Sequence, residues 1–199
     1  MIIQRIMDKK KMEIRSVSEL PEVSEARHIR GYAIVWGVES RVLCDWDGEF
    51  VEIIERGAVD DALLARSDVK ALFNHMRDYL LARYTNGEGT LQLTIDEKGL
   101  RYDFDAPATT WGNDVLELVK RGDLRGSSFA FTADDVVYSQ RADGTRVRRV
   151  RKLSGLYDVS IVVDPAYTQT SVDARAFDDA KMGRSLEDCR KKMKRLFNQ

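Results

Sequence analysis

The stretch LRGSSFAFTADDVVYS, from Leu124 to Ser139, decides how the rest of the chain is interpreted. Apolar residues alternate in it with small or polar ones, which is typical of a β-strand with two different faces. The stretch RVRRVRKLSG that follows, residues 146–155, predicts the strand that pairs with it. Alternation places Ser127 on the face of the two following phenylalanines, and Ser128 on the opposite face among very small side chains.

Other strands are predicted on both sides of this pair. Short apolar runs, bounded by glycine, proline and polar turn residues, indicate them. Because the connections between these runs are short, we expect a mostly antiparallel barrel or sandwich rather than a parallel sheet. The predicted strands cover residues 28–36, 49–56, 68–75, 91–95, 100–104 and 156–164, the last ending at Pro165.

Helices are predicted at three places, so the fold class is expected to be α+β. A short helix is expected within residues 60–68, and the clearest one lies within 110–123, where Thr110 is a candidate N-cap. We interpret residues 1–27 as a mobile N-terminal arm and 28–175 as the β domain. The tail, 176–199, is predicted to form a basic amphipathic helix.

Composition excludes several classes of function. The 199 residues include 32 Lys and Arg against 33 Asp and Glu, so no overall positive charge suggests a nucleic-acid partner. No apolar run approaches the length of a membrane span. The two cysteines, Cys44 and Cys189, and the two histidines, His28 and His75, are widely spaced. A zinc site and a disulfide scaffold are therefore not expected.

Three residues have the chemistry of a hydrolytic site. Ser128 is a possible nucleophile, His75 ends an apolar strand and is a possible general base, and Asp158 lies inside a Val/Ile strand, where a carboxylate needs a partner. Asp96 and Glu97, in a hairpin turn, are alternative carboxylates. The residues alone leave a second interpretation open, because small side chains around Ser128 also permit tight packing of the sheet.

Five stretches follow one another along the chain: EIIERGAV (52–59), DVKALFNH (68–75), NGEGTLQLTIDEKGL (86–100), RGDLRGSSFAF (121–131) and DVSIVVDPAY (158–167). Taken together and in this order, they resemble the prohead maturation proteases of tailed phages, a family of assemblin-like serine proteases. The resemblance implies a compact, mostly antiparallel β-barrel surrounded by helices. It also implies an enzyme that is packaged in the immature capsid, removes the scaffold or the scaffold-like arm of the capsid protein, and digests itself.

The resemblance also implies roles for individual residues. The family histidine closes the second stretch and corresponds to His75. The family serine precedes an aromatic residue in a G-x-S-F-G-F pattern, which here is GSSFAF, so Ser128 corresponds to the nucleophile. The third member is not fixed by the resemblance; Asp158 comes first because it follows the serine on a strand, and Asp96 and Glu97 come second.

The sequence departs from the family pattern at two positions. Ala130 replaces a usual glycine and narrows the space beside Ser128, and Met76 follows the histidine where an acidic or polar residue is usual. Neither change removes a catalytic group.

The implied partners are the major capsid protein or the scaffold protein as substrate, with a homodimer as a possibility that the resemblance adds. No cofactor, metal, membrane or specific nucleic acid is expected. The implied location is the prohead in the host cell cytoplasm. The alternative function is a non-enzymatic assembly module that binds capsid or scaffold through the same fold.

Overall fold

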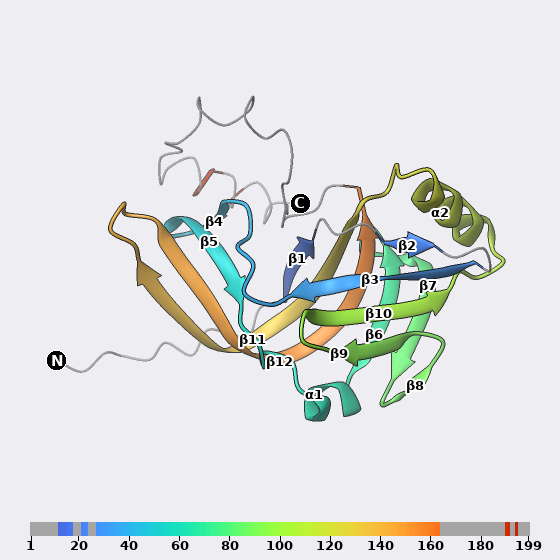
Figure 1. The fold of residues 1–199 in the computed structure, drawn as a ribbon. Helices are drawn as coiled ribbons and strands as arrows, with labels where there is room; N and C mark the ends of the chain where they lie inside the picture. Colours follow the sequence, from blue (N-terminus) through green and yellow to red (C-terminus); the bar gives the residue numbers. More distant parts are fainter. Residues whose placement is uncertain (1–11, 18–20, 24–26, 164–189, 192–193, 195–199) are drawn as a thin grey trace.

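A long antiparallel hairpin forms the centre of the molecule (Figure 1). The structure, a computed structural model, describes residues 12–17, 21–23, 27–163, 190–191 and 194. The hairpin consists of β11 (Gly126–Gln140) and β12 (Arg146–Val162), which are the two strands that the sequence pattern predicts. The last predicted strand, which begins after residue 155, is the continuation of β12 rather than a separate strand.

The hairpin belongs to an eight-stranded sheet with the order β1-β11-β12-β6-β7-β8. β5 is added to this sheet through β12, and β4 through β5. β12 pairs in parallel with β5 near its start and with β6 near its end, so one long strand joins two neighbours along the same edge. The other strands are β1 (Glu13–Val17), β4 (Leu43–Asp45), β5 (Gly48–Ile54), β6 (Asp68–Phe73), β7 (Met76–Thr85) and β8 (Glu88–Gly89).

A second, four-stranded sheet lies across the first (Figure 1). Its order is β2 (Glu22–Val23), β3 (His28–Val35), β10 (Gly99–Asp105) and β9 (Gln92–Ile95). The alternating strands of both sheets contribute their apolar faces to one buried core, because burying these side chains is the main favourable term in folding. The core includes Phe129, Phe131, Val159 and Ile161 from the first sheet and Ile29, Leu100 and Phe104 from the second.

Two helices of the described part of the chain, α1 (Asp61–Ala65) and α2 (Thr110–Lys120), lie at opposite edges of the sheets (Figure 1). The N-cap of α2 is Thr109 rather than the predicted Thr110. Thr109 has extended backbone angles, and its side-chain oxygen accepts a hydrogen bond from the backbone N–H of Gly112 at 3.1 Å. Thr110 already has helical geometry, so it cannot be the cap.

The predicted fold class is wrong. Of the described residues, 58% are in strands and 13% in helices, and their sheets are open and mixed, with no closed barrel. The α+β prediction, a mostly antiparallel barrel surrounded by helices, fails for a physical reason. β12 is long enough to pair in parallel with two strands, β5 and β6, from distant parts of the chain. The prediction was based on short turns, which indicate antiparallel pairing of neighbouring strands and carry no information about such distant parallel pairs.

The two ends of the chain are described only in part. β1 and β2 lie within the predicted arm, residues 1–27, of which residues 1–11, 18–20 and 24–26 are outside the described residues. The predicted C-terminal helix and the predicted strand end at Pro165 are also outside them, except for residues 190–191 and 194. Cys44, in β4, is disulfide-bonded, a single bond that the wide spacing of the cysteines did not indicate. No helix among the described residues is long and apolar enough to cross a membrane.

Candidate active site

A two-residue turn between β6 and β7 positions His75. Asn74 and His75 both have positive φ, +50° and +59°, and Phe73 pairs with Met76 across them. Positive φ at both central residues is the geometry of a type I′ hairpin turn, which asparagine tolerates better than histidine. The turn is fixed to β12, because the Asn74 N–H donates to the Ile161 carbonyl at 2.9 Å. His75 is thereby placed beside the end of β12.

The register of β11 and β12 gathers polar side chains on one face of the hairpin. Ser128 lies directly opposite Ser160, and Ala130 lies directly opposite Asp158. Residues that oppose each other in an antiparallel pair share a face, as do residues two apart on one strand. Ser128, Ser160 and Asp158 therefore lie together. Ser127 faces the core instead, where its hydroxyl is 2.7 Å from the Tyr102 hydroxyl.

The turn and the hairpin bring the three predicted site residues into one hydrogen-bonded row. His75 Nδ1 is 2.6 Å from Asp158 Oδ1, and His75 Nε2 is 2.5 Å from Ser128 Oγ. With a proton on Nδ1, the imidazole donates to the carboxylate and presents the Nε2 lone pair to the serine. His75 is thus in contact with both a hydroxyl whose proton it could accept and a carboxylate that could orient its ring.

The Ser128 hydroxyl has a second acceptor, which the sequence pattern does not reveal. It also donates to the backbone carbonyl of Arg15 in β1 at 2.8 Å. A hydroxyl carries one proton, so Arg15 O and His75 Nε2 compete for it. For His75 to act as a base, the proton has to point toward Nε2.

Burial of this face strengthens its polar contacts. Ser128 is 0% exposed, and the side chains of His75 and Asp158 are 17% and 11% exposed. Hydrogen bonds to a charged group are stronger than hydrogen bonds between neutral groups. Because little water reaches this face, these bonds are also screened less than they would be at the surface. These hydrogen bonds therefore hold Ser128, His75 and Asp158 in fixed positions relative to one another.

A fourth polar side chain contacts the row. The Ser160 hydroxyl donates to Asp158 Oδ1 at 2.9 Å and lies 3.2 Å from His75 Nδ1. Ser160 is not among the predicted site residues. Alternation along the strand was the available signal, because Ser160 is two residues after Asp158 and therefore on the same face.

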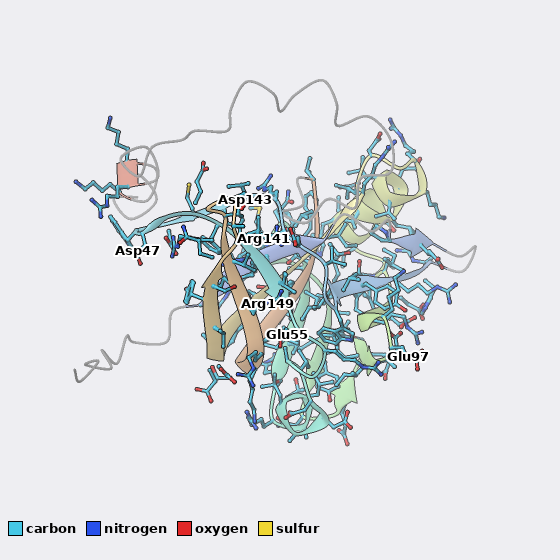
Figure 2. The ribbon with its side chains drawn as sticks, turned by 60° about the vertical axis from the view of Figure 1, so that its left-hand side comes forward. Asp47, Glu55, Glu97, Arg141, Asp143 and Arg149 are labelled. Carbon is cyan, nitrogen blue, oxygen red and sulfur yellow. The ribbon has the colours of Figure 1, made fainter. Side chains whose placement is uncertain are left out.

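The alternative carboxylates lie in another part of the fold. Asp96 is in the β9–β10 turn, where its Oδ2 accepts from the Tyr32 hydroxyl at 2.7 Å and its Oδ1 from the Lys98 and Gly99 N–H groups, each at 2.9 Å. Partial burial raises the pKa of Asp96, but these hydrogen bonds outweigh it and hold the pKa below its ordinary value. Glu97, in the same turn, is exposed at the edge of the molecule (Figure 2). Asp158 is the carboxylate in contact with His75.

The cation on the neighbouring strand is already paired. Lys70 lies opposite Asp158 in the parallel β6–β12 pair, and its ammonium donates to Asp68 Oδ2 at 2.8 Å. Arg83 donates to the same carboxylate, and mainly this contact, followed by that of Lys70, holds the pKa of Asp68 below its ordinary value. Lys70 therefore forms its ion pair with Asp68 and not with Asp158.

A buried group of charges fixes β1 beside Ser128. Arg15 Nε donates to Glu52 Oε1 at 2.6 Å, and Arg148 donates to both Glu13 and Glu52. Burial lowers the pKa of Arg148, but the two carboxylates raise it above its ordinary value. The sequence pattern places Arg148 only in a predicted strand and does not indicate its charged partners. These pairs join β1, β5 and β12, and so they hold the Arg15 carbonyl against Ser128.

A serine hydroxyl in contact with a histidine that contacts a carboxylate is the arrangement of serine hydrolases. The family model of the Caudovirus prohead serine protease matches residues 10–185 of the 199 in the chain, and the chain belongs to this family. The predicted resemblance is thereby confirmed, and the chain is placed among the proteases of phage capsid maturation. No curated protein and no solved structure matches the chain significantly.

The described residues contain no group of three or more His, Cys, Asp and Glu side chains that could hold a metal ion.

Proposed function

We propose that this protein is a serine endopeptidase that cleaves the scaffold, or the scaffolding arm of the major capsid protein, inside the phage prohead and also cleaves its own chain. Ser128 is the nucleophile, His75 the general base and Asp158 the group that orients it. The observation that carries this proposal is the contact of His75 with both Ser128, at 2.5 Å, and Asp158, at 2.6 Å.

The first half of the reaction forms an acyl-enzyme. Ser128 Oγ attacks the carbonyl carbon of the scissile peptide while His75 Nε2 takes its proton. Asp158 stabilises the imidazolium through the Nδ1–H bond. The tetrahedral intermediate then collapses, His75 gives its proton to the leaving amine, and the new N-terminus departs.

The second half releases the acid product. A water molecule gives a proton to His75 and attacks the Ser128 ester, and the proton returns to Ser128 Oγ when the ester bond breaks. No cofactor enters either half. The same protonation cycle of His75 therefore serves both steps.

The family supports a setting as well as a reaction. Members are prohead serine proteases, so capsid-related chains are the proposed substrates and the prohead in the host cell cytoplasm is the proposed location. A chain with an activated serine inside a closed shell meets its substrates at high effective concentration. This favours a protease with modest affinity for each cleavage site.

Co-expression with the capsid or scaffold protein of the same phage tests the proposal. Wild type, Ser128→Ala and Ser127→Ala are compared by intact mass of every chain. We expect wild type and Ser127→Ala to cut the partner and themselves, and Ser128→Ala to leave both full length. Ser127→Ala is the matched control, because it removes a neighbouring hydroxyl that faces the core.

Two results would contradict the proposal in different ways. Cleavage by Ser128→Ala at the wild-type rate would exclude Ser128 as the nucleophile. Binding of the partner without cleavage by all three proteins would favour the assembly-module alternative.

A further inference from the structure

The Ser160 hydroxyl is a buried polar group beside the proposed catalytic row, and the reaction described above gives it no role. Ser160 is 1% exposed and lies directly opposite Ser128 in the β11–β12 pair. A buried hydroxyl needs a hydrogen-bond partner, because leaving it without one costs about 1–3 kcal/mol. Its partners are therefore informative.

The proton of Ser160 is committed to Asp158. The hydroxyl donates to Asp158 Oδ1 at 2.9 Å, a charge-assisted bond, whereas its distance to His75 Nδ1 is longer, 3.2 Å. Because the one proton goes to the carboxylate, the Ser160 oxygen faces His75 as an acceptor.

His75 Nδ1 consequently faces two acceptors, Asp158 Oδ1 and Ser160 Oγ. Only the tautomer with a proton on Nδ1 satisfies both. In the other tautomer, the Nδ1 lone pair would lie 2.6 Å from a carboxylate oxygen. The Nδ1–H tautomer is also the one that leaves Nε2 free to accept the Ser128 proton.

We propose that Ser160 is a positioning residue that holds the Asp158 carboxylate in place and fixes the Nδ1–H tautomer of His75. This inference rests on the proposed function, since it concerns the same row of residues. Ser160 does not touch substrate. It acts on Ser128 only through Asp158 and His75.

Ser127 provides a matched control for Ser160. Both serines are almost fully buried, and both have a side-chain hydroxyl or carboxylate partner within 3 Å. They differ in the face that they occupy, since Ser127 contacts Tyr102 in the core. Replacing either by alanine removes one hydroxyl and leaves a similar small void.

The first test measures the reactivity of Ser128 without any peptide substrate. A fluorophosphonate probe bonds to an activated serine oxygen and releases fluoride, so its second-order labelling rate reports how well His75 takes the serine proton. We expect Ser160→Ala to lower this rate about 10-fold, the size of one lost hydrogen bond to a charged group, with Ser127→Ala near the wild-type rate. Thermal unfolding checks that both variants are folded.

The second test reads the tautomer directly. The chain has only two histidines, so labelling their imidazole rings with ¹⁵N gives two sets of resonances. The set that disappears in His28→Gln belongs to His28, and the remaining set belongs to His75. We expect the wild type and Ser127→Ala to show a protonated Nδ1 and an unprotonated Nε2 at His75. In Ser160→Ala, part of the population should shift to the opposite tautomer.

The outcomes separate this inference from the proposed function. If wild type is not labelled, or Ser128→Ala is labelled equally, the proposed function fails. If wild type is labelled at Ser128, but Ser160→Ala keeps both the wild-type rate and the wild-type tautomer, the positioning role is overturned and the function stands.

Discussion

His75 has a backbone conformation that few histidines adopt. Its φ of +59° lies in the left-handed region, where a Cβ atom crowds the following carbonyl at a cost of about 1–2 kcal/mol. Such a conformation persists only where its surroundings hold it, and here the side chain contacts Ser128 on one nitrogen and Asp158 on the other. Strain at this one residue is consistent with a functional constraint on its position.

Asp158→Asn should lower the fluorophosphonate labelling rate of Ser128 by about 10⁴-fold. An amide in place of the carboxylate can turn its NH₂ toward Nδ1, which favours the wrong tautomer of His75. Asp96→Asn is the control, because Asp96 is bonded to Tyr32 and to its own turn. Equal rate losses in the two variants would show that Asp158 has no specific role.

At the level of single residues, two patterns pointed to parts of the site. Strand alternation separated Ser127 from Ser128, and the cost of burying a carboxylate in an apolar strand singled out Asp158, which the structure places in contact with His75. Alternation does not report which strands become neighbours. The Arg15 carbonyl was missed for that reason, since it reaches Ser128 only through the pairing of β1 with β11.

The turn between β6 and β7 is the element that positions His75 beside Ser128 and Asp158. Phe73 and Met76 are the last paired residues on the two sides of this turn. The Asn74 side chain accepts a hydrogen bond from the Val163 N–H at 3.3 Å. The turn therefore depends on Asn74 in two ways, through its tolerance of positive φ and through this contact. Replacements can separate the two.

Asn74→Gly should keep the turn and most of the labelling rate, because glycine adopts positive φ without strain. Asn74→Val should destabilise the protein by about 1–2 kcal/mol more than Asn74→Gly, since a β-branched residue is strained at a φ of +50°. Urea unfolding gives the free energies, and labelling gives the effect on the site. Equal stability of the two variants would mean that the positive φ at this position does not constrain the sequence.

At the level of elements, the strands were predicted better than their arrangement. The strands around Leu100 and Phe129 follow from local alternation, and the helix after Thr109 follows from its periodicity. The closed barrel was wrong because closure depends on long-range pairing. The parallel contacts of β12 with β5 and β6 join segments about 90 to 100 residues apart, beyond the reach of any local pattern.

Across the whole molecule, charged side chains connect elements that are distant in sequence. Glu52 is 0% exposed and accepts from Arg15 and Arg148, which joins three strands of the larger sheet. Figure 2 shows a contrasting pair on the surface, Glu55 and Arg149, which are 3.4 Å apart and substantially exposed. The two pairs should differ strongly in their effect on stability.

Glu52→Ala should lower the free energy of unfolding by about 3–5 kcal/mol, because it removes the fully buried carboxylate that Arg15 and Arg148 share and leaves Glu13 as their remaining partner. Glu55→Ala should cost no more than about 1 kcal/mol, as is usual for an exposed pair. Urea unfolding of both variants measures the difference. A loss below about 1 kcal/mol for Glu52→Ala would show that the buried charges contribute little to stability.

Stability should also depend on pH through His28. The hydrogen bond to Asp105, and then that to Asp103, raise the pKa of His28 in the folded protein above its ordinary value of 6.5. Its contribution is therefore fully present below about pH 6.5 and is lost as pH rises through the folded-state pKa. The side chain is 38% exposed, so screening limits the contribution to about 1 kcal/mol at most.

Urea unfolding of wild type and His28→Gln at about pH 5.5 and about pH 8.5 measures this contribution. The wild type should be the more stable of the two at the lower pH, and the difference should shrink at the higher pH. A difference that grows with pH would contradict the assigned ion pairs.

The placement of the proposed catalytic residues along the chain has a consequence for synthesis. His75 is separated from Ser128 by 53 positions and from Asp158 by 83, and they meet only when β6 docks in parallel on the end of β12. A ribosome releases residues in order, so a nascent chain that already carries the histidine and the serine still lacks the carboxylate. We therefore expect a growing chain to be inert toward its neighbours and itself until β12 has emerged, which delays any cleavage until both strands of the central hairpin have been made.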